Sequence, residues 1–482
     1  MLFNSFKFLI FFPIVTALYY IIPHKARWIL LLGASYYFYM CWKPEYIVLI
    51  IISTMIDYFA GIMMGRTEEK KKRKKYLLLS LVSNLGLLFT FKYFNFFNEA
   101  MGQPFKQFKL LLPVGISFYT FQTLSYSIDV YKGKIKPEKH LGIFALYVSF
   151  FPQLVAGPIE RSEKLLPQFY EKHGFDYDRF TSGLVQMGWG FFKKIIIADR
   201  VAILVNQVYN NVTEYTGIQL IVATIFFAFQ IYCDFSGYSD IAIGLARILG
   251  FDLMKNFNRP YFATSIPDFW RRWHISLSTW FKDYLYIPLG GSKTTKSRWY
   301  FNLIITFLIS GLWHGANWTF IIWGLVHGFY QIVAITTRKM RGSFVRAIRL
   351  DRIPILHKLL NIMVTFSLVC FAWIFFRANN ANDALYIVTH LFDGVLEIKS
   401  IGVLSAYMSV LGLEEVEFCI AVGAIILMEV IQFIQGEREI YAVLNNSPIF
   451  LRWAVYYMIV FATLFFGIYG GSVDIQFIYF QF

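Results

Sequence analysis

The chain has 482 residues, of which 57% are hydrophobic, 20% aromatic and only 16% charged. A soluble domain averages about 45–50% apolar and about 25% charged residues, so this composition argues against a soluble enzyme, a disordered chain, a fibre or a disulfide scaffold. It predicts an integral membrane protein. Each cysteine lies in an apolar run without CxxC spacing, which favours buried free thiols over disulfides or metal ligands. The four are Cys41, Cys233, Cys370 and Cys419.

The net charge of +15 is concentrated in two segments between apolar runs. Arg66–Lys75 carries seven basic and two acidic residues, and Arg338–Lys358 carries seven basic and one acidic residue. Lys and Arg accumulate in short cytoplasmic loops of membrane proteins, so both segments are predicted to be cytosolic. Basic loops also attract anionic lipid, which makes membrane lipids an expected partner. A nucleic-acid partner is not expected, because the charge lies in loops and not on a polar folded face.

From the N-terminus, Phe3–Ile22 is apolar apart from Lys7 and has no small-residue cleavage site. It is predicted to be the first membrane span and not a removable signal. Two more apolar runs, 30–40 and 46–64, precede the basic segment that begins at Arg66. Three spans ending at a cytosolic loop place the N-terminus on the extracytoplasmic side.

About eleven to thirteen membrane segments are expected, in an all-α polytopic fold. Since a straight span needs about 20 residues, several apolar runs are too short or too interrupted to cross simply, and re-entrant segments are expected. The polar stretches 160–180 and 251–300 are too small to be independent domains, so the chain is predicted to form a single membrane-embedded domain over 1–482. The further apolar runs are 76–97, 110–131, 141–157, 182–209, 217–250, 301–312, 316–336, 359–377, 416–434 and 450–469.

Polar groups within apolar runs are costly and mark sites of function or helix contact. The first such place is FQIYCDFSGYSDIAIG, 229–244, where Gln230, Asp234 and Tyr238 fall on one helical stripe. Two interpretations are open. Asp234 and Asp240 hold helices together through hydrogen bonds, or they line a substrate tunnel and orient a catalytic group.

The second place is PDFWRRWHISLSTWFKDYLYIPLGG, 267–291, where aromatic and cationic residues alternate. Trp and Tyr favour the membrane interface and cations reach phosphates, so a re-entrant or interfacial helix is predicted. Its polar residues include Arg271, Arg272, His274 and Asp283. Simple anchoring is the alternative to anion binding.

The third place is GLWHGANWTFIIWGLVHG, 311–328, which sets His314 and His327 in apolar surroundings. A neutral buried histidine can take a proton from a hydroxyl nucleophile and return it to a leaving group. Haem ligation is the competing chemistry, but no second histidine pair with this spacing is present. The sequence also lacks HxxxH, HExxH or a Cys/His cluster, so no metal and no bound cofactor are expected.

The fourth place comprises two segments, 111–134 and 150–169, in which proline and glycine interrupt helices at membrane depth. Broken helices are tolerated there only around protein or a water-filled cavity. These segments are therefore predicted to form cavity walls.

Together these motifs resemble the membrane-bound O-acyltransferases, in the same order along the chain. The segments are GISFYTFQTLSYSIDVYKG, FFPQLVAGPIER, CDFSGYSDIAIG, FWRRWHISLSTWFKDYLYIPLGG and GLWHGANWTFIIWGLVHG. Within that superfamily the pattern is nearest to the bacterial alginate O-acetylation branch, to which the terminal FGIYGGSVDIQFIYFQF is also similar. The teichoic-acid D-alanylation branch is a close cousin.

The resemblance implies a ring of helices around a thinned centre, with N-terminal helices in 1–110, a catalytic core in 111–340 and C-terminal helices in 341–482. It implies that His314 is the catalytic histidine and His274 the second catalytic position. His327 recurs in the family's WGLVHG but faces away from His314 on an unbroken helix, so it is secondary. The residues expected to bind substrate or line the tunnel are Asp234, Tyr238, Gln230, Trp313, Asn317, Arg271, Arg272 and Asp283.

The resemblance implies acetyl transfer from a cytosolic thioester, with acetyl-CoA as donor, for O-acetylation of an exported or cell-surface polysaccharide. His314 would be the general base, and an extracytoplasmic partner protein would relay acetyl or modify the polysaccharide. The expected location is the bacterial plasma membrane. Two alternatives stay open: D-alanyl transfer from an acyl carrier protein towards teichoic acid, and a proton-coupled transporter, for which no inverted repeat is visible.

Overall fold

The computed structural model describes residues 1–108, 110–155, 157–395, 410–436, 438, 440–445, 447–469 and 477–478. These residues form helices and connecting segments without strands, which confirms the all-α prediction. Two compact units are present: Met1–Phe191 with Tyr238–Lys255, and Phe192–Gly237 with Asn256–Phe482. The single domain with its three sections and the ring around a thinned centre stay predictions. Most of the terminal motif, 466–482, lies outside the described residues.

Membrane spans are evident from the length and apolarity of the helices. Among the described residues, seven helices are long and apolar enough to cross a membrane, and two shorter apolar helices cover Phe6–Ile21 and Leu141–Leu154. The protein is therefore a multi-pass membrane protein, while the expected eleven to thirteen segments stay a prediction. The seven are Pro44–Gly65, Lys70–Ala100, Ile218–Ile248, Trp318–Thr336, Pro354–Arg377, Glu415–Gln435 and Ile449–Phe466.

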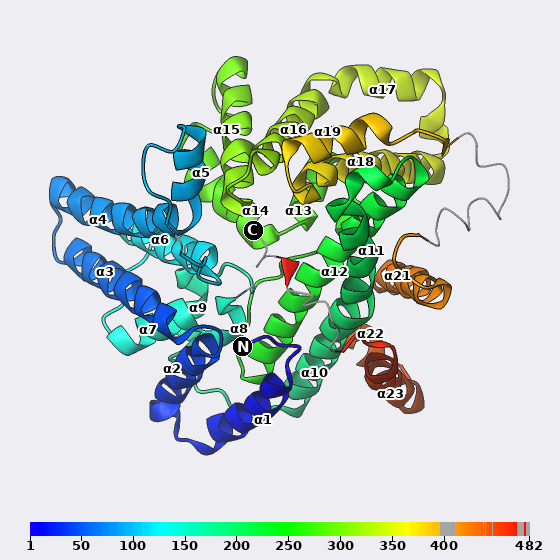
Figure 1. Cartoon of the computed structure of the whole chain (residues 1–482). Coiled ribbons are helices and arrows are strands. Elements are labelled where there is room, and N and C mark those ends of the chain that lie inside the picture. The colour runs from blue at the N-terminus through cyan, green and yellow to red at the C-terminus, as the bar shows by residue number, and fades with distance from the viewer. Residues whose placement is uncertain are drawn as a thin grey trace. The chain divides into compact units, whose positions relative to one another are not determined.

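In the first unit, α3, α4 and α6 lie side by side (Figure 1). They pack around a buried carboxylate, Asp57. Asp57 accepts hydrogen bonds from Ser80 Oγ, from Asn84 Nδ2 at 2.9 and 3.0 Å, and from Ser127 Oγ at 3.3 Å. A buried carboxylate must be hydrogen-bonded, so this cluster satisfies the charge while holding three helices together. The helices of this unit are α1 Phe6–Ile21, α2 His24–Met40, α3 Ile47–Gly65, α4 Lys70–Leu88, α5 Phe94–Ala100, α6 Ile116–Lys132, α7 Leu141–Ser149, α8 Phe151–Leu154, α9 Ser162–Gln168 and α10 Tyr177–Phe191.

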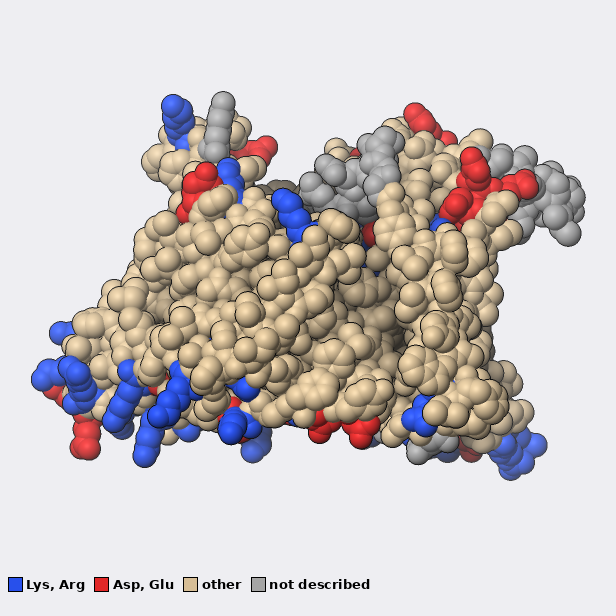
Figure 2. All heavy atoms as spheres, turned by 90° about the horizontal axis from the view of Figure 1, so that it is seen from below, with Lys and Arg blue, Asp and Glu red and all other residues tan. Residues whose placement is uncertain are grey.

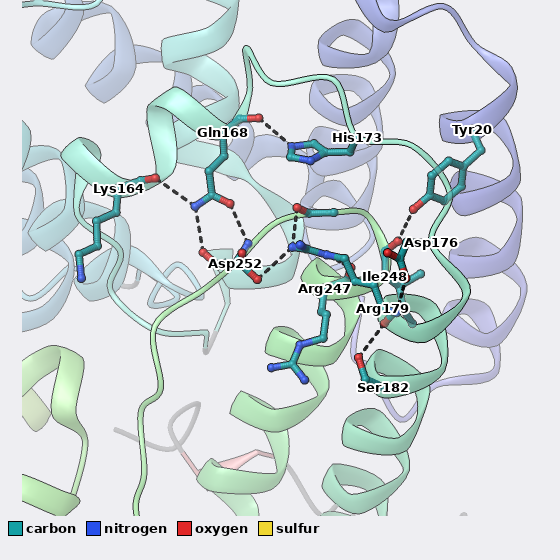
Figure 3. Close-up of polar contacts among 11 residues, drawn as sticks. Tyr20, Lys164, Gln168, His173, Asp176, Arg179, Ser182, Arg247, Ile248 and Asp252 are labelled. Carbon is teal, nitrogen blue, oxygen red and sulfur yellow. Dashed lines mark hydrogen bonds and ion pairs between the residues drawn. The ribbon is translucent and has the colours of Figure 1, made fainter. Parts of the chain in front are cut away.

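A polar clamp joins α9 and α10 to the loop that follows α12 (Ile218–Ile248) (Figure 3). The Arg179 guanidinium donates to the carbonyl oxygens of Arg247 and Gly250 and pairs with Asp252 Oδ1 at 2.9 Å. The Gln168 side chain exchanges two hydrogen bonds with the backbone of Asp252, at 2.7 and 3.0 Å. These bonds pair carbonyl oxygens at the end of α12 that have no partner within the helix, and they fix the path of the chain as it leaves α12.

The second unit contains the helices that follow α10, except that α12 contributes residues to both units, and it contains the histidine motifs 267–291 and 311–328. The two helices that pack most closely in this unit are α15 and α16, which form a hairpin in which small residues permit close approach of the backbones. A Cβ on Gly311 would overlap the carbonyl oxygen of Phe320, and one on Gly324 would overlap that of Phe307. The elements are η3 Phe192–Ala198, α11 Asp199–Asn210, α13 Ile266–Arg272, α14 Ile275–Phe281, η6 Lys282–Tyr286, α15 Lys296–His314, α16 Trp318–Thr336, α17 Arg338–Ala347, α18 Pro354–Arg377, α19 Ala381–His390, α21 Glu415–Gln435, α22 Ile440–Asn445 and α23 Ile449–Phe466.

The surface reflects the membrane environment. Figure 2 shows charged side chains gathered along the margins of the face drawn, with uncharged surface between them. Cys233 and Cys370 are buried free thiols, as predicted. Cys41 and Cys419 are free thiols as well, but the predicted burial is wrong for both, because Cys41 is half-buried and Cys419 is exposed on α21. In a lipid environment an apolar run does not require burial within protein, because the bilayer itself solvates it.

Candidate active site

His314 is the last residue of α15, at the bend of the hairpin with α16. Gly315 is extended, and the Asn317 side chain caps α16 by accepting from Thr319 N at 3.1 Å. Asn317 Nδ2 also donates to the carbonyl oxygen of Asn379 at 3.0 Å. This geometry gives Asn317 a capping function, whereas its predicted contact with substrate stays a prediction.

The helix is broken at Gly315, so the unbroken helix on which His327 would face away from His314 is not present. Both imidazoles pack against one indole, Trp323, with centroid distances of 5.1 Å to His314 and 4.9 Å to His327. The earlier expectation assumed a continuous helix, but the chain reverses between the two histidines. Trp270 Nε1 donates to His327 Nδ1 at 3.3 Å, so the proton of the neutral ring is on Nε2.

Three aromatic rings enclose the His314 imidazole, which is buried. Ring centroids lie at 5.0 Å from Trp313, 5.1 Å from Trp323 and 5.2 Å from Phe376. Trp313 is itself buried next to His314, and its contact with substrate stays a prediction. Such surroundings exclude water from the imidazole and place it against aromatic ring surfaces.

His274 lies between α13 and α14 with φ 42° and ψ 56°, in the left-handed region that a non-glycine residue seldom occupies. Its Nδ1 is 3.1 Å from Asn256 Oδ1, which also accepts from the Ser276 hydroxyl at 2.9 Å. Since a carbonyl oxygen only accepts, Nδ1 carries the proton and Nε2 carries the lone pair. Burial lowers the pKa of His274 to about 3, which keeps the ring neutral.

The two predicted catalytic histidines meet at Trp313. The centroid of its indole is 5.0 Å from that of His314 and 6.1 Å from that of His274. One histidine comes from the end of α15 and the other from the turn between α13 and α14. The fold therefore gathers two buried imidazoles, separated by forty residues of sequence, around one aromatic ring.

A cavity of about 470 Å³ lies beside this region and is lined by α13, α14, η6 and α15. Arg271 and Lys282 supply positive charge, while Ser278 and Thr279 supply hydroxyl groups. Trp270, the hydrogen-bond partner of His327, forms part of the wall. A cavity with cations, hydroxyls and aromatic surface suits a phosphorylated, partly apolar ligand.

Unlike Arg271, Arg272 and Asp283 are not among the residues that line the cavity. Arg272 Nε pairs with Asp268 Oδ1 at 2.9 Å, four residues earlier on α13, and does not line the cavity. Asp283 lies half-buried in η6. The structure thus places only the first of the two adjacent arginines at the cavity wall, and ligand contact by Arg272 or Asp283 stays a prediction.

The predicted stripe Gln230, Asp234 and Tyr238 lies on α12 with all three side chains buried. Asp234 Oδ1 pairs with Lys194 Nζ at 2.7 Å, and Asp234 Oδ2 accepts from Ile478 N at 2.7 Å. In the first unit, Tyr238 stacks on Phe3 at 4.6 Å, and its hydroxyl accepts from Phe3 N. These contacts support the helix-contact interpretation of the stripe, and tunnel lining stays a prediction.

Sequence reasoning missed three residues here. Lys194 bridges Asp234 and Asp199, at 2.7 and 2.8 Å, from an apolar run in which its charge is unusual. Asn256 orients His274 through a hydrogen bond to its Nδ1. Trp323 packs against the imidazoles of both His314 and His327. The adjacent lysines KK in 193–194 were the one available signal, since buried cations in a membrane are rare.

Within the described residues, no three His, Cys, Asp or Glu side chains gather as metal ligands.

Comparison with known proteins matches residues 139–376 to the model of the MBOAT, membrane-bound O-acyltransferase family. The chain is 41% identical over 406 residues to a protein named probable alginate O-acetylase AlgI from Azotobacter vinelandii, covering 82% of this chain and 78% of the relative. It is 37% identical to a peptidoglycan O-acetyltransferase from Helicobacter pylori, covering 80% and 79%. A teichoic acid D-alanyltransferase from Bacillus subtilis is 27% identical, covering 55% and 68%. This chain belongs to the membrane-bound O-acyltransferase family.

Proposed function

We propose that this protein transfers an acetyl group from a cytosolic thioester through the membrane for O-acetylation of an exported or cell-surface polysaccharide. Relatives at 41% and 37% identity are named for alginate and peptidoglycan O-acetylation, and the D-alanyltransferase is more distant at 27%. The observation that carries the proposal is the convergence of His314 and His274 on Trp313. Two buried imidazoles in dry surroundings suit proton transfer to and from oxygen and sulfur.

In the proposed reaction His314 is the general base. It takes the proton of an acceptor hydroxyl as the oxygen attacks the thioester carbonyl. The C–S bond then breaks, and the protonated His314 returns the proton to the leaving thiolate. Thioester and alcohol therefore become ester and thiol, with no net change on the enzyme. General base catalysis of this kind contributes about 10²–10⁴-fold.

His274 is proposed to support the reacting groups from the other side of Trp313. Its Nδ1–H is directed to Asn256, which fixes the ring and leaves the Nε2 lone pair as its acceptor. A ring held in this way packs against Trp313, which in turn contacts His314, so His274 keeps the general base in place. The function of His274 is thus orientation and not a second proton transfer.

The proposed donor is acetyl-CoA, reaching the site from the cytosolic side. The cavity beside α13 and α14 supports this, because Arg271 and Lys282 can pair with the phosphates of the carrier arm. The proposed location is the bacterial plasma membrane, with the N-terminus outside. A partner protein outside the membrane would carry acetyl to the polysaccharide.

The test compares a strain lacking the gene with the same strain carrying it. Alkali-released esters from envelope and secreted polysaccharide are measured by mass spectrometry. The proposal predicts that acetate depends on the gene and that D-alanine does not. Dependence of D-alanine would transfer the assignment to the teichoic-acid branch. Dependence of neither ester would reject acyl transfer to an exported polymer.

A further inference from the structure

Helix α17, Arg338–Ala347, has a surface that the acyl-transfer reaction does not use. None of its residues is buried. Met340 and Phe344 are 67% and 62% exposed, and Ile348, just after the helix, is 51% exposed. Since these residues are spaced by four, they form one apolar stripe along the helix.

The opposite side of α17 is basic. At 100° per residue, Arg338, Lys339 and Arg346 lie at least 80° from every residue of the apolar stripe. The helix contains no acidic residue, and Arg349 and Arg352 extend the charge beyond its end. An exposed apolar stripe with a basic face is typical of a helix that lies in a membrane surface.

The position of α17 along the chain agrees with a location in the membrane surface. It begins two residues after Thr336, the end of the α16 span, and the short turn after it leads to Pro354, where the α18 span begins. A helix between the ends of two consecutive spans lies where the hydrocarbon meets the headgroups. The apolar stripe then contacts acyl chains, and the basic face is at the level of lipid phosphates.

We infer that α17 lies in the membrane surface and binds anionic phospholipids, such as phosphatidylglycerol, through Arg338, Lys339 and Arg346. Charge complementarity favours an anionic headgroup over a zwitterionic one. The apolar stripe favours lipid over a soluble acidic protein, because such a protein would leave Met340 and Phe344 in water. The inference does not depend on the proposed reaction, since it concerns binding alone.

The basic run at the start of α4 is a matched control. Lys70, Lys71 and Lys74 are exposed like the α17 cations, but their helix begins with six consecutive basic residues and has no apolar stripe there. The test variant is Arg338→Gln/Lys339→Gln/Arg346→Gln, and the control is Lys70→Gln/Lys71→Gln/Lys74→Gln. Both remove three positive charges from exposed helical positions. Arg341 is left intact, because it donates to the end of α16 through Ala334 O.

The experiment uses the full chain in vesicles containing photoreactive phosphatidylglycerol or phosphatidylcholine with the same reactive group near the headgroup. Crosslinks to the peptide covering 338–349 are quantified by mass spectrometry. We expect phosphatidylglycerol to label this peptide at least fivefold more than phosphatidylcholine. The α17 variant should reduce the ratio to near one, and the α4 variant should leave it unchanged.

A second variant, Phe344→Ser, tests the seating of the helix. It should reduce labelling by both lipids, because the apolar stripe no longer holds α17 among acyl chains. Equal labelling of the wild type by both lipids would overturn the inference, as would a loss of preference in the α4 variant. Absence of labelling by either lipid would also overturn it, placing α17 in water or against a protein. Equal abundance and melting temperature of the variants establish that all are folded.

Discussion

Asn256 holds His274 through a hydrogen bond of 3.1 Å between its Oδ1 and His274 Nδ1. The bond selects the tautomer of the imidazole and fixes a ring that stands on strained backbone with φ 42°. Asn256 is eighteen residues from His274, yet both are buried at the same point. Asn256 is thus a positioning residue for His274.

The first prediction concerns this bond. Asn256→Ala should lower the rate of acyl transfer about 10–100-fold, because the imidazole loses its fixed tautomer and orientation. Asn256→Asp should recover part of the rate, since it restores an acceptor oxygen. The carboxylate should also move the acidic limb of the pH–rate profile to higher pH, because a negative charge favours imidazolium. A merely structural function of Asn256 would leave that profile unmoved.

The second prediction concerns the α15–α16 hairpin. Gly324→Ala should destabilise the protein and abolish most transfer, because the added Cβ overlaps Phe307 O and displaces Trp323 from His314. Gly423→Ala in α21 is the control, since a Cβ there meets nothing within 4 Å. The control should be neutral or up to about 1 kcal/mol more stable. Thermal unfolding in detergent and transfer assays measure both, and equal behaviour of the two variants would contradict the account.

The third prediction concerns the buried ion group of Lys194, Asp199 and Asp234. Lys194→Met should cost about 3–5 kcal/mol of unfolding free energy, because two carboxylates lose their shared cation. Asp234→Asn should cost less, since Lys194 keeps Asp199 at 2.8 Å. Denaturation of the detergent-solubilised protein gives the order of the two effects. A larger loss in Asp234→Asn would reject the view that Lys194 is the centre of the group.

The fourth prediction concerns Glu160, a buried carboxyl between α8 and α9. Burial raises its pKa to about 7, although the Met254 N–H and nearby cations oppose the shift. A carboxyl with a raised pKa in the folded state contributes stability that is present below pH 4.5 and is lost as pH rises towards 7. The loss is at most about 1.4 kcal/mol per pH unit in that window.

Glu160→Gln should therefore remove a fall in melting temperature between pH 4.5 and 7 that the wild type shows. Glu163→Gln, at an exposed position in the first turn of α9, is the control and should retain the wild-type dependence. Melting curves of the detergent-solubilised proteins across this range provide the measurement. An unchanged pH dependence in Glu160→Gln would assign the fall to other groups.

The sequence allowed the membrane class, the helical fold and the candidate histidines to be predicted, because apolar runs and buried charges are local signals. The four-residue spacing of Asp268 and Arg272 is a local signal of their ion pair, which the interpretation of Arg272 as a ligand-binding residue did not use. The chain reversal at Gly315 was not predicted, because a single glycine also occurs within continuous helices.

Contacts between residues that are far apart in the sequence were not predicted. Lys194 and Asp234 are forty residues apart, and Asn256 lies in a stretch without periodicity. Their meeting depends on how helices pack and not on spacing along one helix. Only the fold shows that the Asp234 carboxylate is occupied by Lys194 and the Ile478 N–H.

The most direct test of the central claim is the amount of alkali-released acetate from polysaccharide in a strain carrying His314→Ala. His357→Ala, in α18 and outside the group of rings around His314, is the control. At equal protein abundance, acetate should fall to the level of the deletion strain in His314→Ala and stay at the wild-type level in His357→Ala. Wild-type acetate in His314→Ala would contradict the assignment of His314 as the general base.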